Sequence, residues 1–382
     1  FTAASFRDAA TGTFLCLGDH GGKRKMFRQF AEMLKREFKG YNGKKFGKDV
    51  LAGVTVAAVA LPLALAFGVS SGATAASGLV TAIISGLIIG ALSGASYQIS
   101  GPTGAMTAIL VSLVAQYGMQ GVFIASLLAG IILLLCGIFK LGGLVSYLPS
   151  PVITGFTSGI AIIIALGQID NLTGMKSVGL NNLEKIASYF TTPQSFNLTA
   201  FIIGVCVIVF MFVYPQKLSQ YCPGSLAAII LATTANFIFN FDVSVVGEIP
   251  KTIFLADRLD ITKINFSELG NFVVPAVSIA ALGLIESLLC GASAGRMKNE
   301  KLNADIELTA QGIGNILLPF FGGIPATAAI ARTSVAIKSG AKTRLTGVFH
   351  AVGLLISMFL LAPVMSKIPL AALAGVLMVT AW

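Results

Sequence analysis

The sequence predicts an all-α polytopic membrane protein in which two short, interrupted helices lie at membrane depth. Hydrophobic residues fill 55% of the 382 positions and charged residues only 11%, whereas soluble domains carry roughly 25% charged residues. Runs without Asp, Glu, Lys or Arg recur from end to end, for example over 200–213 and 345–364, which disfavours a soluble enzyme with buried helices. In the segment 320–344, the stretch between Pro325 and Lys338 is shorter than the ~20 residues of a full crossing and predicts a half-helix.

Composition and motifs also exclude several classes of protein. The five cysteines are scattered without a CxxC pair and the two histidines, His20 and His350, are isolated, so we expect no disulfide framework and no metal site. No GxxxxGK[ST] loop and no catalytic spacing is present, so we expect neither an enzyme nor a cofactor. The net charge of +10 comes from the N-terminal segment and the loops, which indicates membrane topology rather than nucleic-acid binding.

The N-terminal segment 1–49 is predicted to be cytoplasmic because it is rich in Lys and Arg. Over 26–38, apolar residues recur at helical spacing among basic ones, the pattern of an amphipathic helix on an anionic leaflet. A solvated linker is the alternative. The chain begins with Phe1 and its first methionine is Met26, so we expect 1–25 to be the interior of a fragment or not native coding sequence.

The first half of the chain is expected to hold charge-free spans and one half-helix. That half-helix covers 103–115 and follows the strand-like stretch YQISG, with Pro102 at its first turn. A Pro-kinked ordinary span is the alternative. The expected full spans are 50–68, 73–92, 122–139, 152–167, 200–213 and 225–239.

The second half repeats this order. Spans 273–294 and 308–320 precede the second half-helix, and 345–362 and 369–382 follow it. Corresponding Gly/Pro-interrupted segments in two halves are typical of an inverted repeat with its site at the midplane. A seven-plus-seven arrangement needs two further spans, so we expect the sequence to be incomplete at the C-terminus. With the N-terminus inside, the polar connections 170–192 and 241–269 lie outside, in agreement with the positive-inside rule.

Glu286 and Arg332 are the two clear charges inside predicted spans, where each costs about 2.5 to 3.5 kcal/mol on insertion scales. One interpretation is a buried ion pair that pins two helices. The other is functional: Arg332 adds positive potential beside a substrate anion, and Glu286 takes up a proton or orders the site.

The half-helices predict a preference for anions, since each N-terminus carries about +0.5 of an elementary charge and several unpaired N–H groups. If helices start at Thr103 and Ala326 and face one another, they form a cradle for a small oxyanion or halide. Small side chains let a ligand approach the backbone, although tight helix packing explains them equally well. The predicted substrate-binding residues are Ser100, Gly101, Thr103, Gly104, Ala326, Thr327, Ala328, Ala329 and Arg332, with Glu286 as the coupling residue.

Four motifs together resemble the bacterial SulP family of sulfate permeases. They are DVLAGVTVAAVALPLALAFGV, YQISGPTGAMTAI, GLIESLLC and GGIPATAAIARTSVAIKSGAKTRLTGVFHA. The resemblance covers residues 46–382 and implies a uracil-permease-like seven-plus-seven fold, usually dimeric, that works by an elevator movement. It implies a core domain at 50–140 and 271–363 and a gate domain at 141–270 and 364–382. The anion is then expected between Thr103 with its neighbours and 326–332.

The resemblance has one chemical departure. Sodium-coupled bicarbonate members carry an aspartate with a threonine one turn later, whereas here Glu286 is followed by Cys290, a poor ligand for a hard cation. The resemblance therefore favours coupling to protons over coupling to sodium. Family members typically end in a STAS domain, which we expect to be cut off together with the last spans.

We therefore expect a secondary transporter of sulfate-like, bicarbonate-like or dicarboxylate anions in the plasma (inner) membrane, driven by proton symport or by exchange. A channel-like anion conductor, a nucleobase permease of the same fold and a non-transporting membrane sensor are the alternatives. Arg332 and the GPTG segment favour an anion over a nucleobase. The expected partners are the anion, protons, lipid and a second copy of the chain, but no nucleic acid.

Overall fold

The computed structural model describes residues 21–143, 150–177, 182–191, 195–215, 218, 222–263 and 269–382. Contacts divide the chain into a unit that ends at Lys39 and a unit Gly40–Trp382. The first unit contains α1 (Gly21–Glu37), where Arg28 and Glu32 form a surface pair at 3.0 Å. The predicted N-terminal helix is therefore present, and its position on a membrane surface stays a prediction.

The second unit is helical, as the apolar runs predicted. Six helical stretches among the described residues are long and apolar enough to cross a membrane: α2 (Gly43–Ser70), α3 (Ala75–Leu92), α4 (Gly104–Ile138), Thr154–Thr173, α11 (Leu269–Lys298) and α14 (Leu345–Met365). The stretch Thr154–Thr173 belongs to α5 (Ser150–Gly167) and α6 (Ile169–Thr173). The other α-helices in the described part of the chain are α7 (Asn182–Thr191), α8 (Leu198–Val213), α10 (Gly224–Phe239), α12 (Ala304–Leu317), α13 (Ile330–Lys338) and α15 (Leu370–Ala381).

Local chemistry explains where several of these helices begin and bend. The side chains of Asn42, Thr74 and Asn303 accept backbone N–H groups at the starts of α2, α3 and α12, which satisfies donors that a helix leaves unpaired. The predicted first half-helix and the span after it form one helix, α4, that is interrupted at Gly118 with φ of 63°. Glycine adopts this left-handed conformation without the steric cost that a Cβ brings.

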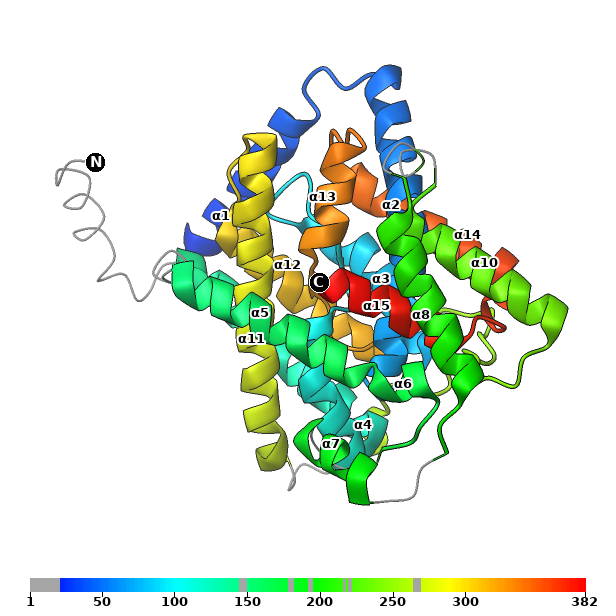
Figure 1. The fold of residues 1–382 in the computed structure, drawn as a ribbon. Coiled ribbons are helices and arrows are strands. Elements are labelled where there is room, and N and C mark those ends of the chain that lie inside the picture. Colours follow the sequence, from blue (N-terminus) through cyan, green and yellow to red (C-terminus); the bar gives the residue numbers. More distant parts are fainter. Residues whose placement is uncertain are drawn as a thin grey trace. The chain divides into compact units, whose positions relative to one another are not determined.

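By their contacts, the helices of the second unit pack in two groups. Figure 1 shows the arrangement of the individual helices. In one group, α14 packs against α2 and α3, while α4 packs against α11 and α12. In the other, α15 contacts α5, α6, α8 and α10. The groups touch through α4 against α5 and through α2 against α10 and α15.

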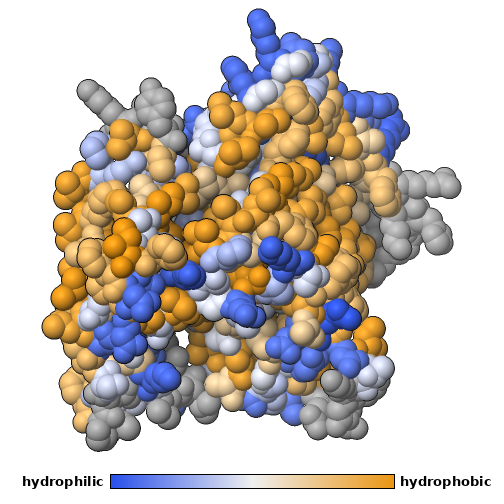
Figure 2. Space-filling view, turned by 90° about the vertical axis from the view of Figure 1, so that its right-hand side faces the viewer, coloured by the Kyte–Doolittle hydropathy of each residue, from blue (hydrophilic) through white to orange (hydrophobic). Residues whose placement is uncertain are grey.

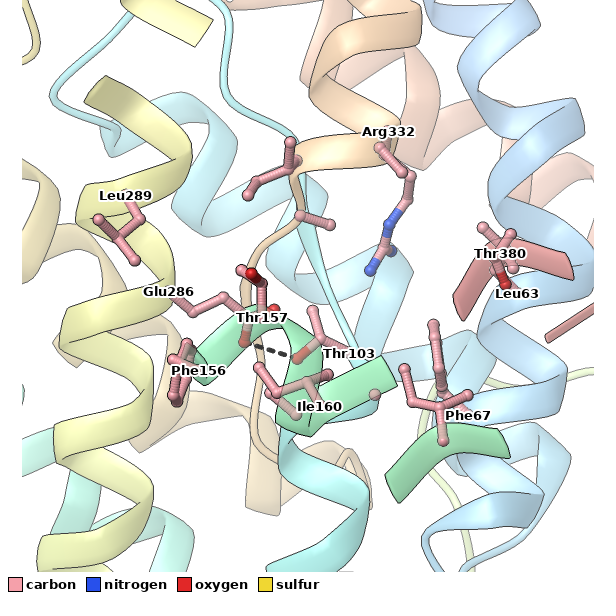
Figure 3. Close-up of a pocket in the computed structure, with 16 residues that line it drawn as sticks. Leu63, Phe67, Thr103, Phe156, Thr157, Ile160, Glu286, Leu289, Arg332 and Thr380 are labelled. Atoms are coloured by element: carbon pink, nitrogen blue, oxygen red, sulfur yellow. Dashed lines mark hydrogen bonds between the residues drawn. The ribbon is translucent and has the colours of Figure 1, made fainter. Parts of the chain in front are cut away.

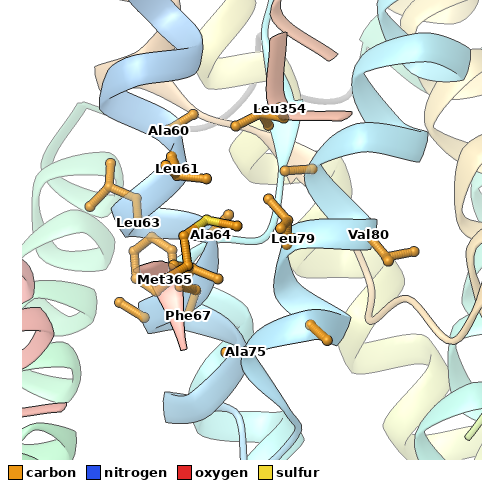
Figure 4. Packing of buried hydrophobic residues seen from close by; sticks show 14 of the residues in the cluster. Ala60, Leu61, Leu63, Ala64, Phe67, Ala75, Leu79, Val80, Leu354 and Met365 are labelled. Atoms are coloured by element: carbon orange, nitrogen blue, oxygen red, sulfur yellow. The ribbon is translucent and has the colours of Figure 1, made fainter. Parts of the chain in front are cut away.

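Close packing of small and apolar residues holds the first group together. Figure 4 shows Ala64 and Phe67 of α2 beside Leu79 of α3, within one buried cluster. A Cβ added to Gly78 would lie 2.0 Å from the carbonyl oxygen of Ala64, so α2 and α3 pack this closely only because residue 78 is glycine. Small residues at such contacts allow the close backbone approach on which helix association in lipid depends.

Large apolar side chains cover much of the outer surface. The face in Figure 2 is mostly hydrophobic, with hydrophilic residues gathered in patches. Exposed examples on α8 and α10 are Phe212, Val213, Phe237 and Ile238. A surface of this kind suits contact with lipid.

A short strand precedes each half-helix in the chain, and the two strands pair with one another. β1 (Ser100–Gly101) pairs antiparallel with β2 (Thr327–Ala328), so that Ser100 lies opposite Ala328 and Gly101 opposite Thr327. The predicted strand-like segment before each half-helix is therefore confirmed. Because β1 leads into α4 and β2 leads into α13, this pairing sets where both helices start.

Candidate functional site

The two half-helices start side by side, as the cradle hypothesis required. The hydroxyl oxygens of Thr103, at the start of α4, and Thr327, in β2, lie 3.1 Å apart. Both side chains are buried. The crossing of β1 and β2 therefore brings together two segments that are more than 200 residues apart in sequence.

One predicted boundary is wrong. The second helix starts at Ile330, with Ala329 at its N-cap position, and not at Ala326. Residues 327 and 328 are extended because they pair with β1, and the Ala329 N–H donates to the carbonyl oxygen of Ile99 at 2.9 Å. Strand pairing thus delays the helix, whereas the start of α4 after Thr103 agrees with the prediction.

Both pocket-facing helix starts lack a side-chain cap. Thr103 occupies the N-cap position of α4 but makes no capping hydrogen bond, although threonine commonly caps helices. Its hydroxyl instead donates to Oε2 of Glu286 at 2.9 Å. At α13 the N-cap residue is Ala329, which has no polar side chain. The first N–H groups of both helices are therefore left to a ligand or to water.

Glu286 lies between the two helix starts (Figure 3). The same oxygen, Oε2, accepts hydrogen bonds from Thr103 at 2.9 Å and from Thr327 at 2.8 Å. One carboxyl oxygen thus joins one threonine from each half-helix segment. A change in the charge of Glu286 would change both hydrogen bonds at once.

Arg332 enters the site from the first turn of α13. It is 1% exposed, and its Nη2 donates to the carbonyl oxygen of Pro102, just before α4. A Cβ on Gly101 would lie 2.1 Å from Nη1 of Arg332, so glycine is required for the guanidinium to reach this place. Arg332 therefore binds one half-helix segment to the other.

Glu286 and Arg332 form no direct ion pair within 4.0 Å, although both are described residues. Glu286 bonds to two threonines and Arg332 to a backbone carbonyl. The hypothesis that an ion pair between Glu286 and Arg332 pins two helices together is therefore wrong. The two opposite charges face the same pocket without neutralising one another by contact.

A cavity of about 240 Å³ opens in front of these groups. On one side lie Thr103, Gly104, Glu286, Ala329 and Arg332, all predicted site residues. The other predicted residues, Ser100, Gly101, Ala326, Thr327 and Ala328, are buried and do not line the cavity. Further lining residues that the sequence did not indicate come from α2, α5, α11 and α15, namely Leu63, Phe67, Phe156, Thr157, Ile160, Ile164, Leu289 and Thr380.

Among the described residues, three further buried charges were not expected from the sequence. The Asp49 carboxylate, at the start of α2, accepts the backbone N–H groups of Lys342 and Thr343 at 2.6 and 3.0 Å. Glu307 accepts from the hydroxyl of Ser93 at 2.6 Å, and Arg344 donates to the carbonyl oxygen of Ala91 at 2.9 Å. All three stand near helix ends, where a sequence alone gives no signal that a charge is buried. They tie the ends of α2, α3, α12 and α14 together.

The arrangement suits binding of an anion and offers no group for cleaving one. Uncapped N–H groups and a guanidinium attract negative charge, and the apolar wall from α2 and α5 limits competing water. Among the described residues, no three His, Cys, Asp or Glu side chains gather as they would around a metal ion.

Comparisons with known proteins place the chain in a family. A family model described as the sulfate permease family matches residues 46–382. A putative sulfate transporter of Bacillus subtilis, YvdB, is 40% identical over 355 residues, which cover 90% of this chain and 66% of that protein. The bicarbonate transporter BicA of Picosynechococcus is 33% identical over 346 residues, which cover 86% of this chain and 60% of that protein. The chain thus spans three fifths to two thirds of the length of these relatives.

Two solved structures are similar in fold. The transmembrane domain of a cyanobacterium bicarbonate transporter BicA matches with a TM-score of 0.83 and 30% identity over 89% of this chain and 88% of that chain. Murine Slc26a9, an anion transporter in the inward-facing state, matches with a TM-score of 0.82 over 98% of this chain and 66% of that chain. Its identity of 16% makes this second likeness one of fold alone. The predicted class, a helical polytopic membrane fold, is confirmed.

Proposed function

The chain belongs to the sulfate permease family, and from that premise we propose that it carries small anions across a membrane as a secondary transporter. The observation that supports this proposal best is the cavity in front of two uncapped helix starts, with one buried guanidinium beside it. Helix N-termini and guanidinium groups are both selective for negative charge. No group in the cavity is arranged for covalent chemistry on the bound ion.

The anion is proposed to lie between the first turns of α4 and α13. Gly104 and Ala105 on one side, and Ile330 and Ala331 on the other, all line the cavity and belong to first turns whose N–H groups have no partner within the helix. Arg332, which also lines the cavity, adds a full positive charge beside the proposed anion position. Because Arg332 is already bonded to the Pro102 carbonyl, it is held in place before the anion arrives.

Glu286 is proposed to couple transport to protons. When ionised, its carboxylate accepts both threonine hydroxyls and offsets the charge of Arg332. A second negative charge in the same cavity is then repelled. Protonation of Glu286 removes this repulsion, so binding of the anion favours uptake of a proton. Sodium is a weaker candidate, since Cys290, one turn from Glu286, is buried and contacts Thr333 at 3.5 Å and offers sulfur rather than oxygen.

The substrate class is proposed to be small oxyanions. The relatives are named for sulfate and for bicarbonate, and a cavity of about 240 Å³ holds either ion. Among the described lining residues, Arg332 is the one cation and Glu286 the one acid. A divalent anion therefore needs the protonated form of Glu286 more than a monovalent anion does.

The two packing groups are proposed to be the core and gate domains of an elevator transporter. The half-helices, Glu286 and Arg332 belong to the group of α2, α3, α4 and α11 to α14. Phe156, Ile160 and Thr380 face the cavity from the other group. A cavity lined by both groups would open to either side of the membrane if one group slid against the other.

Uptake of labelled anions into proteoliposomes tests the proposal. The protein would be reconstituted and given sulfate, bicarbonate or a dicarboxylate, with an imposed proton or sodium gradient. We expect saturable uptake of an oxyanion that an inward proton gradient increases. R332A should lower uptake by about 10- to 100-fold, the effect of losing a charged hydrogen bond and its charge, while R296A, at an exposed arginine of α11, should not.

Glu286→Gln separates coupling from binding. The variant should still exchange one anion for another but should lose accumulation driven by a proton gradient, and E248Q, at an exposed acid, serves as its control. Accumulation that stays intact in E286Q would refute the coupling role. Flux that does not saturate would point to a channel instead, and the absence of flux despite anion binding would point to a sensor.

A further inference from the structure

The extended segment before α13 is held by side chains that act in place of a neighbouring strand. The Ile324 N–H donates to Oγ1 of Thr81 at 2.8 Å, and the Thr81 hydroxyl lies 3.3 Å from the carbonyl oxygen of Ile324. Two residues later, Asn315 makes the corresponding pair of bonds with Ala326. Alternate residues of an extended chain point their N–H and C=O groups to the same edge, so this edge is completed by α3 and α12.

Asn315 makes the more complete of these two contacts. Its Oδ1 accepts the Ala326 N–H at 2.8 Å, and its Nδ2 donates to the Ala326 carbonyl oxygen at 2.9 Å. Nδ2 also donates to the carbonyl oxygen of Gln311, one turn earlier in α12, at 2.9 Å. Asn315 is 1% exposed, so its amide cannot exchange these partners for water.

The position of α12 is itself fixed. A Cβ on Gly312 would lie 2.4 Å from the backbone nitrogen of Leu134 in α4, and one on Gly130 would lie 2.6 Å from the nitrogen of Ile316. The helix that carries Asn315 is therefore packed backbone to backbone against α4. Asn315 transmits the position of this rigid helix pair to the Ala326 peptide.

The contact lies one residue away from the polar groups of the site. Thr327, which follows Ala326, bonds through its hydroxyl to Glu286 at 2.8 Å and to Thr103 at 3.1 Å. Ala329 and Arg332, which line the cavity, follow within two turns. A shift of the Ala326 peptide would displace the Thr327 hydroxyl and change the direction in which α13 begins.

We propose that Asn315 is a positioning residue for anion binding, whose carboxamide orients the Ala326 peptide and thereby the start of α13. This inference rests on the proposed function. It assigns Asn315 no contact with the anion. Its effect on binding arises because misplacement of a site by about 1 Å can cost on the order of 100-fold.

Asn315→Asp tests the inference through a pH profile. A protonated aspartic acid keeps one acceptor and one donor for Ala326, whereas the ionised form turns a negative oxygen toward the carbonyl groups of Ala326 and Gln311. We expect the Kd for [35S]sulfate to be about threefold above that of the unsubstituted protein at pH 5 and at least about 30-fold above it at pH 8. Glu286, Glu307 and Arg332 titrate in both proteins, so the ratio of the two Kd values reports the change at residue 315 together with its effect on these neighbours.

Asn236 in α10 provides a matched control. Its Nδ2 donates to the carbonyl oxygen of Lys367 at 3.3 Å, and its side chain is also buried, but it contacts neither half-helix segment. N236D should therefore change thermal stability with pH while its sulfate Kd stays within about twofold of the unsubstituted protein. In uptake assays, N315D should raise KM at pH 8 more than it lowers the maximal rate.

A ratio of Kd values that stays constant from pH 5 to pH 8 would overturn the inference. If N315D does not fold, N315S tests the same inference, because the short serine hydroxyl can replace at most one of the two hydrogen bonds to Ala326. Its Kd should rise about threefold to tenfold, and an unchanged Kd would overturn the inference. Failure of the unsubstituted protein to bind sulfate, bicarbonate or a dicarboxylate would instead refute the proposed function, and the inference with it.

Discussion

The starts of α2, α8 and α12, away from the cavity, differ from the starts of α4 and α13 at the cavity in how their first backbone N–H groups are satisfied. At α12 the Asn303 side chain accepts the Ile306 N–H at 3.2 Å, and Asn42 and Asn197 cap α2 and α8 in the same way. At α4 and α13 no side chain does so. At α4 the threonine suited to this task bonds to Glu286 instead. The cavity is therefore a place where the fold leaves helix donors unpaired, and unpaired donors in such a place are available to an anion.

Placing a carboxylate at the uncapped start of α13 should remove the difference between the two kinds of helix start. Of the substitutions considered, it should have the largest effect on sulfate affinity. Aspartate is a preferred N-cap residue, so A329D should not lower the melting temperature. It should weaken sulfate binding by at least about 100-fold, since a fixed negative charge then occupies the place of the ligand. Equilibrium binding and thermal unfolding, measured on the same sample, check both expectations.

Asn303→Asp is the matched control, because it places the same carboxylate at the start of α12, which lies away from the cavity and already has a cap. Its sulfate affinity should not change. If A329D bound sulfate as tightly as the unsubstituted protein, the uncapped helix start would have no role in binding.

Removing the hydroxyl of Thr103 should have an intermediate effect. T103V loses the bonds to Glu286 and Thr327, and we expect a rise of about tenfold in the KM for uptake. The control is T107V, one turn further along α4, whose hydroxyl bonds only to the carbonyl oxygen of Gly104 at 2.6 Å. Equal KM values for the two variants would mean that the link between the half-helices does not matter for transport.

Removing the cap of α12 should test the same comparison at a helix start away from the cavity. N303A should lower the free energy of unfolding by about 1 kcal/mol, the usual value of an N-cap. The anion Kd should stay the same, because α12 uses its cap for stability alone. Chemical denaturation in detergent measures the free energy of unfolding. A change of more than about twofold in the anion Kd would contradict the expectation that the α12 cap has no role in binding.

The smallest effect is expected far from the cavity. Tyr189 of α7 donates to Asp170 at 2.7 Å. Burial raises the pKa of Tyr189 to about 12, and the bond to Asp170 adds to the rise. The contribution of this bond to stability is thus present below pH 10 and is lost only as the pH rises toward 12. Y189F should cost about 1 kcal/mol or less, with unchanged uptake at pH 6 to 8.

Much of the fold followed from the sequence because lipid imposes strict rules on length and polarity. The charge-free run over 200–213 became α8 (Leu198–Val213), and the Gly-Pro pair at 101–102 correctly marked the start of α4. These features are local, so a single sequence shows them. The division into a moving core and a fixed gate is not local and stays a proposal.

The site was predictable in its charges but not in their partners. Glu286 and Arg332 stand out because charges are costly in a span, and both line the cavity. Their hydrogen bonds to Thr103 and to Pro102 depend on a strand pair between residues far apart in sequence. The same pairing moved the start of α13 to Ile330. Asn315, which holds the neighbouring peptide, looks in the sequence like any amide in a helix.

Locating a heavy anion tests the central claim most directly. Selenate, which has the charge and shape of sulfate, can be bound to the crystallised protein and found by its anomalous scattering. The account predicts a selenium peak between the first turns of α4 and α13, within hydrogen-bonding reach of the N–H groups of Gly104 and Ile330. A saturating selenate concentration that gave a peak elsewhere, or no peak, would contradict it.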